Sequence, residues 1–193
     1  QPTALPANER RRASQVVRLT LACIEQALRA SPFPGDTLRS VFATDEGTGE
    51  VSTQMLETLA TTRQVSPLLF PNSVHNAPAG YFSIAWHNRQ PATVASLGLE
   101  SFASGLLCAV TEAVTTHQPV LLVAYDAAMS APMNELLPVN EPTATAWILS
   151  AGTTPAEVRA LGTFNLELAA PGASPSSALP SWLPPRWAAH SSA

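Results

Sequence analysis

The spacing of apolar residues predicts alternating helices and strands along most of the chain. From about Glu9 to Ala30 the apolar positions recur every three or four residues, as on one face of a helix. The continuous apolar run Pro119–Tyr125 is typical of a strand covered on both faces. Helices that alternate with strands indicate a layered α/β domain. The pattern also predicts strands at Leu38–Ala43, Ala92–Leu97, Thr143–Ser150 and Gly162–Ala169, and helices around Val51–Leu59, from Asn76 to about His87, and at Glu100–Thr116.

The predicted helix at Glu100–Thr116 is apolar nearly all round. Gly105, Ala109 and Ala113 are spaced by four residues, so they form a stripe of small side chains that lets another backbone approach closely. A helix that is apolar on every side is expected in the interior of a domain.

Composition and charge narrow the possible functions. Charged residues make up only 12% of the 193 residues, against about 25% in an average domain, so we expect a partner to cover part of the surface. The net charge is −4 and the only basic run is Arg10–Arg12, so nucleic-acid binding is not expected. No stretch approaches the roughly 18 apolar residues of a membrane span. The two cysteines, Cys23 and Cys108, fit a reducing compartment, and we predict a cytoplasmic protein.

Residues 171–193 differ in composition from the rest of the chain. They are rich in serine and contain five prolines, which is typical of an extended segment. We therefore expect a domain at residues 1–170 followed by a tail. Trp182 and Trp187 of this tail either dock on the domain or a partner, or remain exposed.

The sequence carries no motif for a cofactor or a metal. The most glycine-rich turn, Asp45–Glu50, is acidic and would repel a phosphate group. The histidines lack the spacing of metal ligands. We therefore predict neither a cofactor nor a metal site. The four histidines are His75, His87, His117 and His190.

Candidate nucleophiles lie in and after the segment GLESFASG, which begins at Gly98. A serine hydrolase would need the pattern G-x-S-x-G, but Glu100 stands where that pattern places the serine. Ser101, Ser104 and Cys108 are the side chains that an independent thioester-processing enzyme would use. This alternative stays open at the level of the sequence.

The segment from Ser73 to Asp126 resembles the N-terminal half of the β-ketoacyl synthases, which have the thiolase fold. It holds the elements of that family in the same order: the Asn-initiated helix in SVHNAPAGYFSIAWH, a strand, the motif ESFASG, a buried helix, and an apolar strand. The stretches ERRRAS, VSPLLFPNSVHNAPAGYFSIA and ESFASGLL resemble more narrowly the short chain length factors of bacterial aryl polyene and xanthomonadin-type pigment clusters. The resemblance implies half of a thiolase-like fold, an α-β-α layered domain with a mixed sheet and a buried central helix.

By this resemblance, Phe102 occupies the position of the nucleophilic cysteine. The family's motif T-A-C-x-S-G, anchored on Ser104-Gly105, aligns its cysteine with Phe102. In active members the helix dipole favours the thiolate that takes up the acyl chain, and a phenyl ring cannot replace it. The histidines and lysine of the family's C-terminal half, one within an HGTGT motif, have no counterpart in this sequence. The resemblance therefore implies that the chain has no ketosynthase activity alone.

The resemblance also implies a heterodimer with a catalytic ketosynthase, which would bring the chain into contact with an acyl carrier protein. In the family the strands of two N-terminal halves join into one sheet, so Ala92–Leu97, Phe102 and the residues around His75 to Phe82, Asn76 included, are expected at or near the interface. In chain length factors, bulky interface side chains close the end of the partner's acyl tunnel.

Three aromatic side chains are therefore candidates for that gate: Phe102, Tyr81 and Phe82. Each of them could instead be an ordinary core aromatic. His75 is expected to be a hydrogen-bonded structural residue rather than a catalyst. A carrier-protein-binding scaffold module without a tunnel role is a further alternative.

Overall fold

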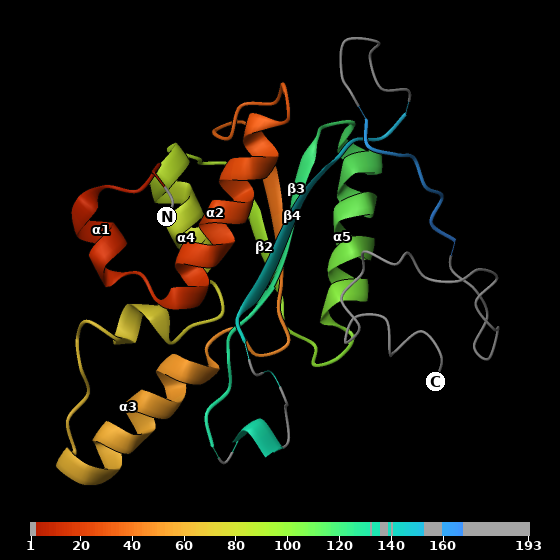
Figure 1. Cartoon of the computed structure of the whole chain (residues 1–193). Coiled ribbons are helices and arrows are strands. Elements are labelled where there is room, and N and C mark those ends of the chain that lie inside the picture. Colours follow the sequence, from red (N-terminus) through yellow and green to blue (C-terminus); the bar gives the residue numbers. More distant parts are fainter. Residues whose placement is uncertain (1–2, 132, 136–138, 140, 153–159, 168–193) are drawn as a thin grey trace. The chain divides into compact units, whose positions relative to one another are not determined.

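The computed structural model describes residues 3–131, 133–135, 139, 141–152 and 160–167. Residues Gln1–Arg159 form one compact unit, and the chain from Ala160 onward forms a second. The first unit is a four-stranded mixed sheet with helices on both faces (Figure 1). This arrangement confirms the α/β class with α-β-α layers that the sequence predicts.

The sheet contains four of the predicted strands. Their order is β2-β1-β3-β4, with β1 parallel to β2 and β3, and β4 antiparallel to β3. Every residue of β3 is buried, as expected for the strand formed by the continuous apolar run. The strands are β1 (Arg39–Ala43), β2 (Ala92–Ala95), β3 (Val120–Asp126) and β4 (Thr143–Leu149).

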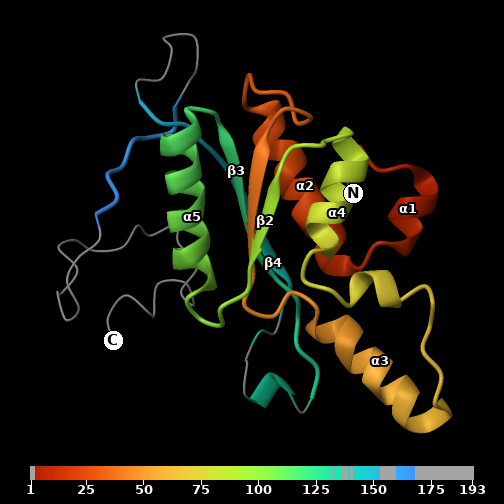
Figure 2. The same cartoon turned by 180° about the vertical axis from the view of Figure 1, so that it is seen from behind.

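Helices α2 (Gln15–Arg29) and α4 (Ala77–Trp86) cover one face of the sheet, and α5 (Ser101–Thr116) covers the other. Figure 2, seen from behind, shows β2 between α4 and α5. The larger core lies on the α2 and α4 side. It includes the apolar face that the sequence predicts for α2 and two aromatic rings of the sheet: Val17, Leu21, Ile24, Phe42 and Tyr125.

The remaining helices are α1 (Ala7–Arg12), α3 (Gly49–Thr62) and the short 3-10 turns at Phe70–Asn72 and Met133–Glu135. Helix α3 extends away from the sheet (Figure 1), and its Leu56 and Leu59 are exposed. None of the helices in the described ranges combines the length and the apolar character needed to cross a membrane.

The single helix predicted for Glu9–Ala30 is in fact two helices, α1 and α2. The chain leaves the helical conformation at Ala13, whose ψ is 135°. Ser14 then begins α2, with its hydroxyl accepting a hydrogen bond from the Val17 amide. An N-cap serine satisfies one of the first free amides of a helix, so it favours a new start at this point.

The strand predicted for Gly162–Ala169 is wrong over the described residues 162–167, which contain no strand. Phe164 and Leu166, the apolar side of the alternating pattern, are 55% and 40% exposed. Alternation produces a strand only where a neighbouring strand supplies hydrogen bonds and one face is covered. Residues 168–193, with the expected boundary at residue 170 and both tail tryptophans, lie outside the described residues.

Candidate functional site

Helix α5 lies on the sheet through its stripe of small residues. Gly105, Ala109 and Ala113 are all buried, which confirms the predicted register. A Cβ atom added at Gly105 would lie 2.6 Å from the Cβ atom of Ala43. The backbones of α5 and β1 are therefore too close for any side chain at this position.

The opposite side of α5 differs from the expectation of a helix buried all round. Leu107 is 37% exposed and Val114 is 52% exposed. A sheet covers only one side of a helix, and no other helix or strand among the described residues packs against α5 with more than marginal contact. The expected buried central helix is thus buried on its sheet side alone.

Phe102 is the second residue of α5 and is half-buried. Its ring meets Trp147 of β4 edge-on, with 5.5 Å between the ring centroids and an interplanar angle of 88°. This geometry is favourable for two aromatic rings. A large apolar side chain therefore occupies the first turn of the helix that packs against the sheet.

The three candidate nucleophiles have different surroundings. Ser101 is buried, and its hydroxyl accepts a hydrogen bond from the Leu97 amide at 2.7 Å and donates one to the Gly98 carbonyl at 2.6 Å. Burial, followed by the negative charge of Glu112, raises the pKa of the Cys108 thiol, which disfavours the nucleophilic thiolate. Ser104 lies in the first turn, where its amide donates to the Glu100 carbonyl. Ser101 and Cys108 are therefore poorly prepared for nucleophilic attack.

Two of the predicted interface residues, Tyr81 and Phe82, lie on the inner side of α4. Tyr81 is 7% exposed and Phe82 is 1% exposed, and both belong to the core on this face of the sheet. The Phe82 ring contacts Phe42, with a centroid distance of 6.1 Å, and Trp86, at 5.3 Å. This burial favours the interpretation of Tyr81 and Phe82 as core aromatics.

Phe102 does not lie with Tyr81 and Phe82. It contacts Trp147 beside the smaller core under α5, whereas Tyr81 and Phe82 lie in the larger core under α4. Because the sheet separates these two cores, the three candidate gate residues do not form one cluster within the chain.

His75 and Asn76 lie just before α4. The Nε2 atom of His75 is 3.6 Å from the Glu46 carboxylate, and its backbone carbonyl accepts a hydrogen bond from the Tyr125 hydroxyl. Asn76 is exposed and occupies the predicted N-cap position, but within the described part of the chain its side chain makes no capping hydrogen bond.

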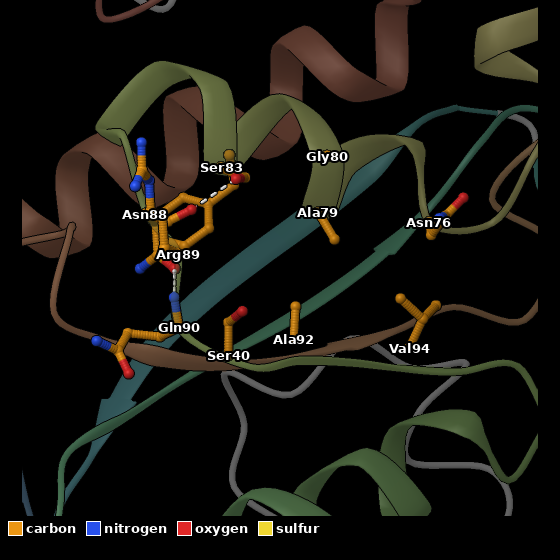
Figure 3. Close-up of a pocket in the computed structure, with 11 residues that line it drawn as sticks. Ser40, Asn76, Ala79, Gly80, Ser83, Asn88, Arg89, Gln90, Ala92 and Val94 are labelled. Carbon is orange, nitrogen blue, oxygen red and sulfur yellow. Dashed lines mark hydrogen bonds between the residues drawn. The ribbon is translucent and has the colours of Figure 1, made fainter.

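A groove with a volume of about 340 Å³ lies between α4 and the outer strand β2 (Figure 3). Helix α4 contributes Ala79 and Gly80 among others, β2 contributes Ala92 and Val94, and Ser40 of β1 also lines it. The sequence reasoning missed this groove. The available signal was Gly80, a glycine near the start of a predicted helix.

Asn88 fixes one end of the groove. Its side-chain amide donates to the carbonyls of Gly35, at 2.6 Å, and Leu38, at 2.8 Å. Its Oδ1 atom accepts from the Gln90 amide, and its carbonyl accepts from the Ser83 hydroxyl (Figure 3). These bonds tie the end of α4 to the start of β1, so the groove has a defined width at this end.

No group of three or more histidine, cysteine, aspartate or glutamate side chains in the described ranges is arranged to hold a metal ion.

Comparisons with known proteins agree with the resemblance in the sequence. A model of the family "beta-ketoacyl synthase, N-terminal domain" matches residues 1–178. The chain is also similar to a chain from the solved complex of the ketosynthase ApeO with its chain length factor ApeC from Xenorhabdus doucetiae, with 29% identity and a TM-score of 0.68. The likeness covers 79% of this chain and 63% of the other, so the chain spans less than two thirds of that relative. No curated protein matches the chain.

Proposed function

The chain belongs to the family of β-ketoacyl synthase N-terminal domains, and on this basis we propose that it is a non-catalytic chain length factor. It would form a heterodimer with a catalytic β-ketoacyl synthase in polyene or fatty-acid-type polyketide synthesis. Contact with the acyl carrier protein would come through that complex, in the cytoplasm.

The observation that carries the proposal is Phe102 at the start of α5. The first turn of a helix is where its dipole stabilises a thiolate, and this position holds a phenyl ring packed on Trp147. The nearest cysteine along the helix, Cys108, is six residues further on, roughly 9 Å along the axis. Its raised pKa opposes the same chemistry. Helix α5 therefore lacks, at its start, the nucleophilic cysteine that active members of the family have there.

Three surface features support a partner. In the described sheet β2 is an outer strand whose Ala92 and Thr93 are exposed, and a strand edge of this kind is a ready template for another strand. The outer side of α5 exposes Leu107 and Val114. The charged fraction of 12% is low for a chain that exposes its whole surface to water. The similar solved structure is itself a complex of a ketosynthase with its chain length factor.

Phe102 is the gate residue that we propose. It is half-buried, whereas Tyr81 and Phe82 are used within the core of the chain itself. A ring that the chain does not fully cover can present part of its surface to a partner. Phe102 would close the end of the ketosynthase's acyl tunnel, and its size would limit the length of the product.

The test uses the complex of the chain with a full-length ketosynthase from the same organism. We expect Phe102→Ala to lengthen the product and Phe102→Trp to shorten it, measured by mass spectrometry of the released polyenes. Phe70→Ala is the matched control, because Phe70 is exposed on a 3-10 turn outside α5 and its loss should leave the product unchanged.

Two outcomes would contradict parts of the proposal. If the complex persists and the product length is the same for all Phe102 variants, the gate role is wrong. If the isolated chain takes up an acyl group or a cerulenin-like electrophile at Ser101, Ser104 or Cys108, the chain is an enzyme in its own right.

A further inference from the structure

The start of α5 is held by the turn that precedes it. The Ser101 hydroxyl accepts a hydrogen bond from the Leu97 amide at 2.7 Å and donates one to the Gly98 carbonyl at 2.6 Å. The Ser101 amide donates to the same carbonyl, and Gly98 has a φ of +62°, which glycine adopts without strain. These bonds fix the backbone next to Phe102, so the orientation of its ring depends on the side-chain torsions and on what the ring meets.

Trp147 of β4 meets the Phe102 ring from the sheet. The two ring centroids are 5.5 Å apart, and the rings are nearly perpendicular, with 88° between their planes. An edge-to-face pair of this kind favours one relative orientation of the two rings. An aliphatic side chain at residue 147 would lack this preference. The contact therefore selects one position of the Phe102 ring.

The sheet fixes the position of Trp147 itself. In the antiparallel register Trp147 pairs with Leu122 of β3, which is 1% exposed. Its side chain packs against the smaller core between the sheet and α5. A side chain on a strand is positioned more precisely than one on a loop. Trp147 can therefore hold the ring of Phe102, which is itself only half-buried.

We propose that Trp147 is the positioning residue of the gate. Its indole ring holds the Phe102 ring in the orientation that closes the acyl tunnel, so the side chain at residue 147 helps to set the length of the product. This inference rests on the proposed function, because it explains how the proposed gate residue is held. Trp147 acts through Phe102 and has no chemical part in the reaction.

The expected direction of the effect follows from the size of the side chain. Leucine is smaller than tryptophan, so Trp147→Leu leaves space into which the Phe102 ring can rotate. The ring then closes the tunnel less completely, and longer products are expected. Trp147→Phe keeps an aromatic partner, so it should retain part of the restraint. With Phe102→Ala no ring is left to hold, so a change at residue 147 should have no further effect.

The test uses the complex of the full chain with the ketosynthase. Trp147→Leu and Trp147→Phe are compared with the wild type, both alone and combined with Phe102→Ala. Mass spectrometry gives the length of the released products, native mass spectrometry gives the composition of the complex, and the melting temperature of each free variant is recorded.

The matched control is Leu149→Ala. Leu149 packs against the same core from the same face of β4. It pairs with Val120, which follows the C-terminal end of α5, so it lies away from Phe102 at the start of that helix. Its truncation should lower the melting temperature by leaving a cavity in this core, without a change at the gate ring.

We expect Trp147→Leu to raise the share of products longer than the wild-type product about fivefold, the factor given by the loss of one aromatic pair. Trp147→Phe should raise it about twofold, because phenylalanine retains part of that pair. In the Phe102→Ala background neither change should alter the product further. Leu149→Ala should leave the product length unchanged, and every variant should still form the complex.

Two results would reject Trp147 as the positioning residue while the proposed gate stands. The first is an unchanged product length for Trp147→Leu in a series where Phe102→Ala lengthens the product. The second is a further lengthening by Trp147→Leu in the Phe102→Ala background, because the effect would then not pass through the ring. If Trp147→Leu forms no complex, Trp147→Phe decides the question by the same criteria.

Two other results would also overturn the inference. An equal lengthening of the product by Leu149→Ala would assign the effect to a general loosening of the core. If Phe102→Ala itself leaves the product length unchanged in an intact complex, the proposed gate is wrong and the role of Trp147 is rejected with it.

Discussion

Helices α4 and α5 each contain a glycine in their first half, but only one of these glycines is explained by a contact in the described part of the chain. Gly105 of α5 allows the helix backbone to rest on β1, because even a methyl group there would lie 2.6 Å from Ala43. Gly80 of α4 faces space in which a side chain would meet nothing within 4 Å in the described structure. Gly105 thus serves the fold, and Gly80 is suited to a surface that another subunit would complete.

For the aromatic residues of the two helices the order is reversed: the ring in α4 is part of the core of the chain, and the ring in α5 is only half-buried. Phe82 of α4 is 1% exposed and contacts two other rings, so the core of the chain uses it fully. Phe102 of α5 is only half-buried, and its ring meets Trp147 edge-on. Each helix therefore has one residue whose contacts stabilise the fold, Phe82 in α4 and Gly105 in α5. The other residue of each pair, Gly80 or Phe102, should contribute less to the free energy of unfolding, and mutation measures this difference.

The largest expected effect is the loss of the Phe82 ring. We expect Phe82→Ala to lower the free energy of unfolding by about 3–5 kcal/mol, as for other buried aromatic side chains. Phe102→Ala should cost about 1–2 kcal/mol, since it loses a half-buried ring and one edge-to-face pair. Urea unfolding followed by circular dichroism measures both. If the two substitutions lower the free energy of unfolding equally, Phe102 is a core residue like Phe82, and the distinction between them is wrong.

The two glycines should respond with opposite signs to the same substitution. Gly105→Ala should destabilise the free chain by about 1–3 kcal/mol, because the new methyl group overpacks the contact with β1. Gly80→Ala should stabilise it by about 0.5–1 kcal/mol through helix propensity. The measurement is again urea unfolding of the free chain. A destabilising Gly80→Ala would mean that the glycine serves the fold after all.

The smallest expected effect concerns the reactivity of Cys108. Burial and Glu112 raise the pKa of its thiol, so at pH 8 less thiolate is present in the folded chain than in the unfolded chain. In a Cys23→Ser background, iodoacetamide should modify native Cys108 more slowly than urea-unfolded Cys108. The pH midpoint of the native rate should lie above the ordinary thiol value of about 8.5. If native Cys108 reacts faster than unfolded Cys108, its thiol is activated by the fold, and Cys108 is again a candidate nucleophile.

Much of the fold could be predicted from local pattern alone. The run that forms β3 is apolar without alternation, which is what a strand covered on both faces requires. The stripe from Gly105 to Ala113 predicted the face of α5 that meets the sheet. In both cases the residues that form the pattern also make the contact.

The wrong predictions share a physical reason, since each depended on something outside the local pattern. Helical periodicity continues across Ala13 and Ser14, but the Ser14 cap starts a new helix there. The alternation of Phe164 and Leu166 has no neighbouring strand in the described residues 160–167. The other faces of α5 are apolar without being covered by the described chain.

The groove could not be predicted from the sequence. Ser40 and Gly80 are forty residues apart and become neighbours of one space only through the order of the strands and the position of α4. Phe102, in contrast, was identified by a short motif, because its place in ESFASG does not depend on tertiary structure. Its partner ring, Trp147, comes from an antiparallel strand that no local pattern links to it.

The most direct test of the central claim is the mass of the species that forms when the chain is co-expressed with a full-length ketosynthase from the same organism. Native mass spectrometry of the purified material should give the mass of one ketosynthase plus one chain of 20.3 kDa. A mass of two ketosynthase chains, with the 20.3 kDa chain detected only by itself, would contradict the proposed heterodimer.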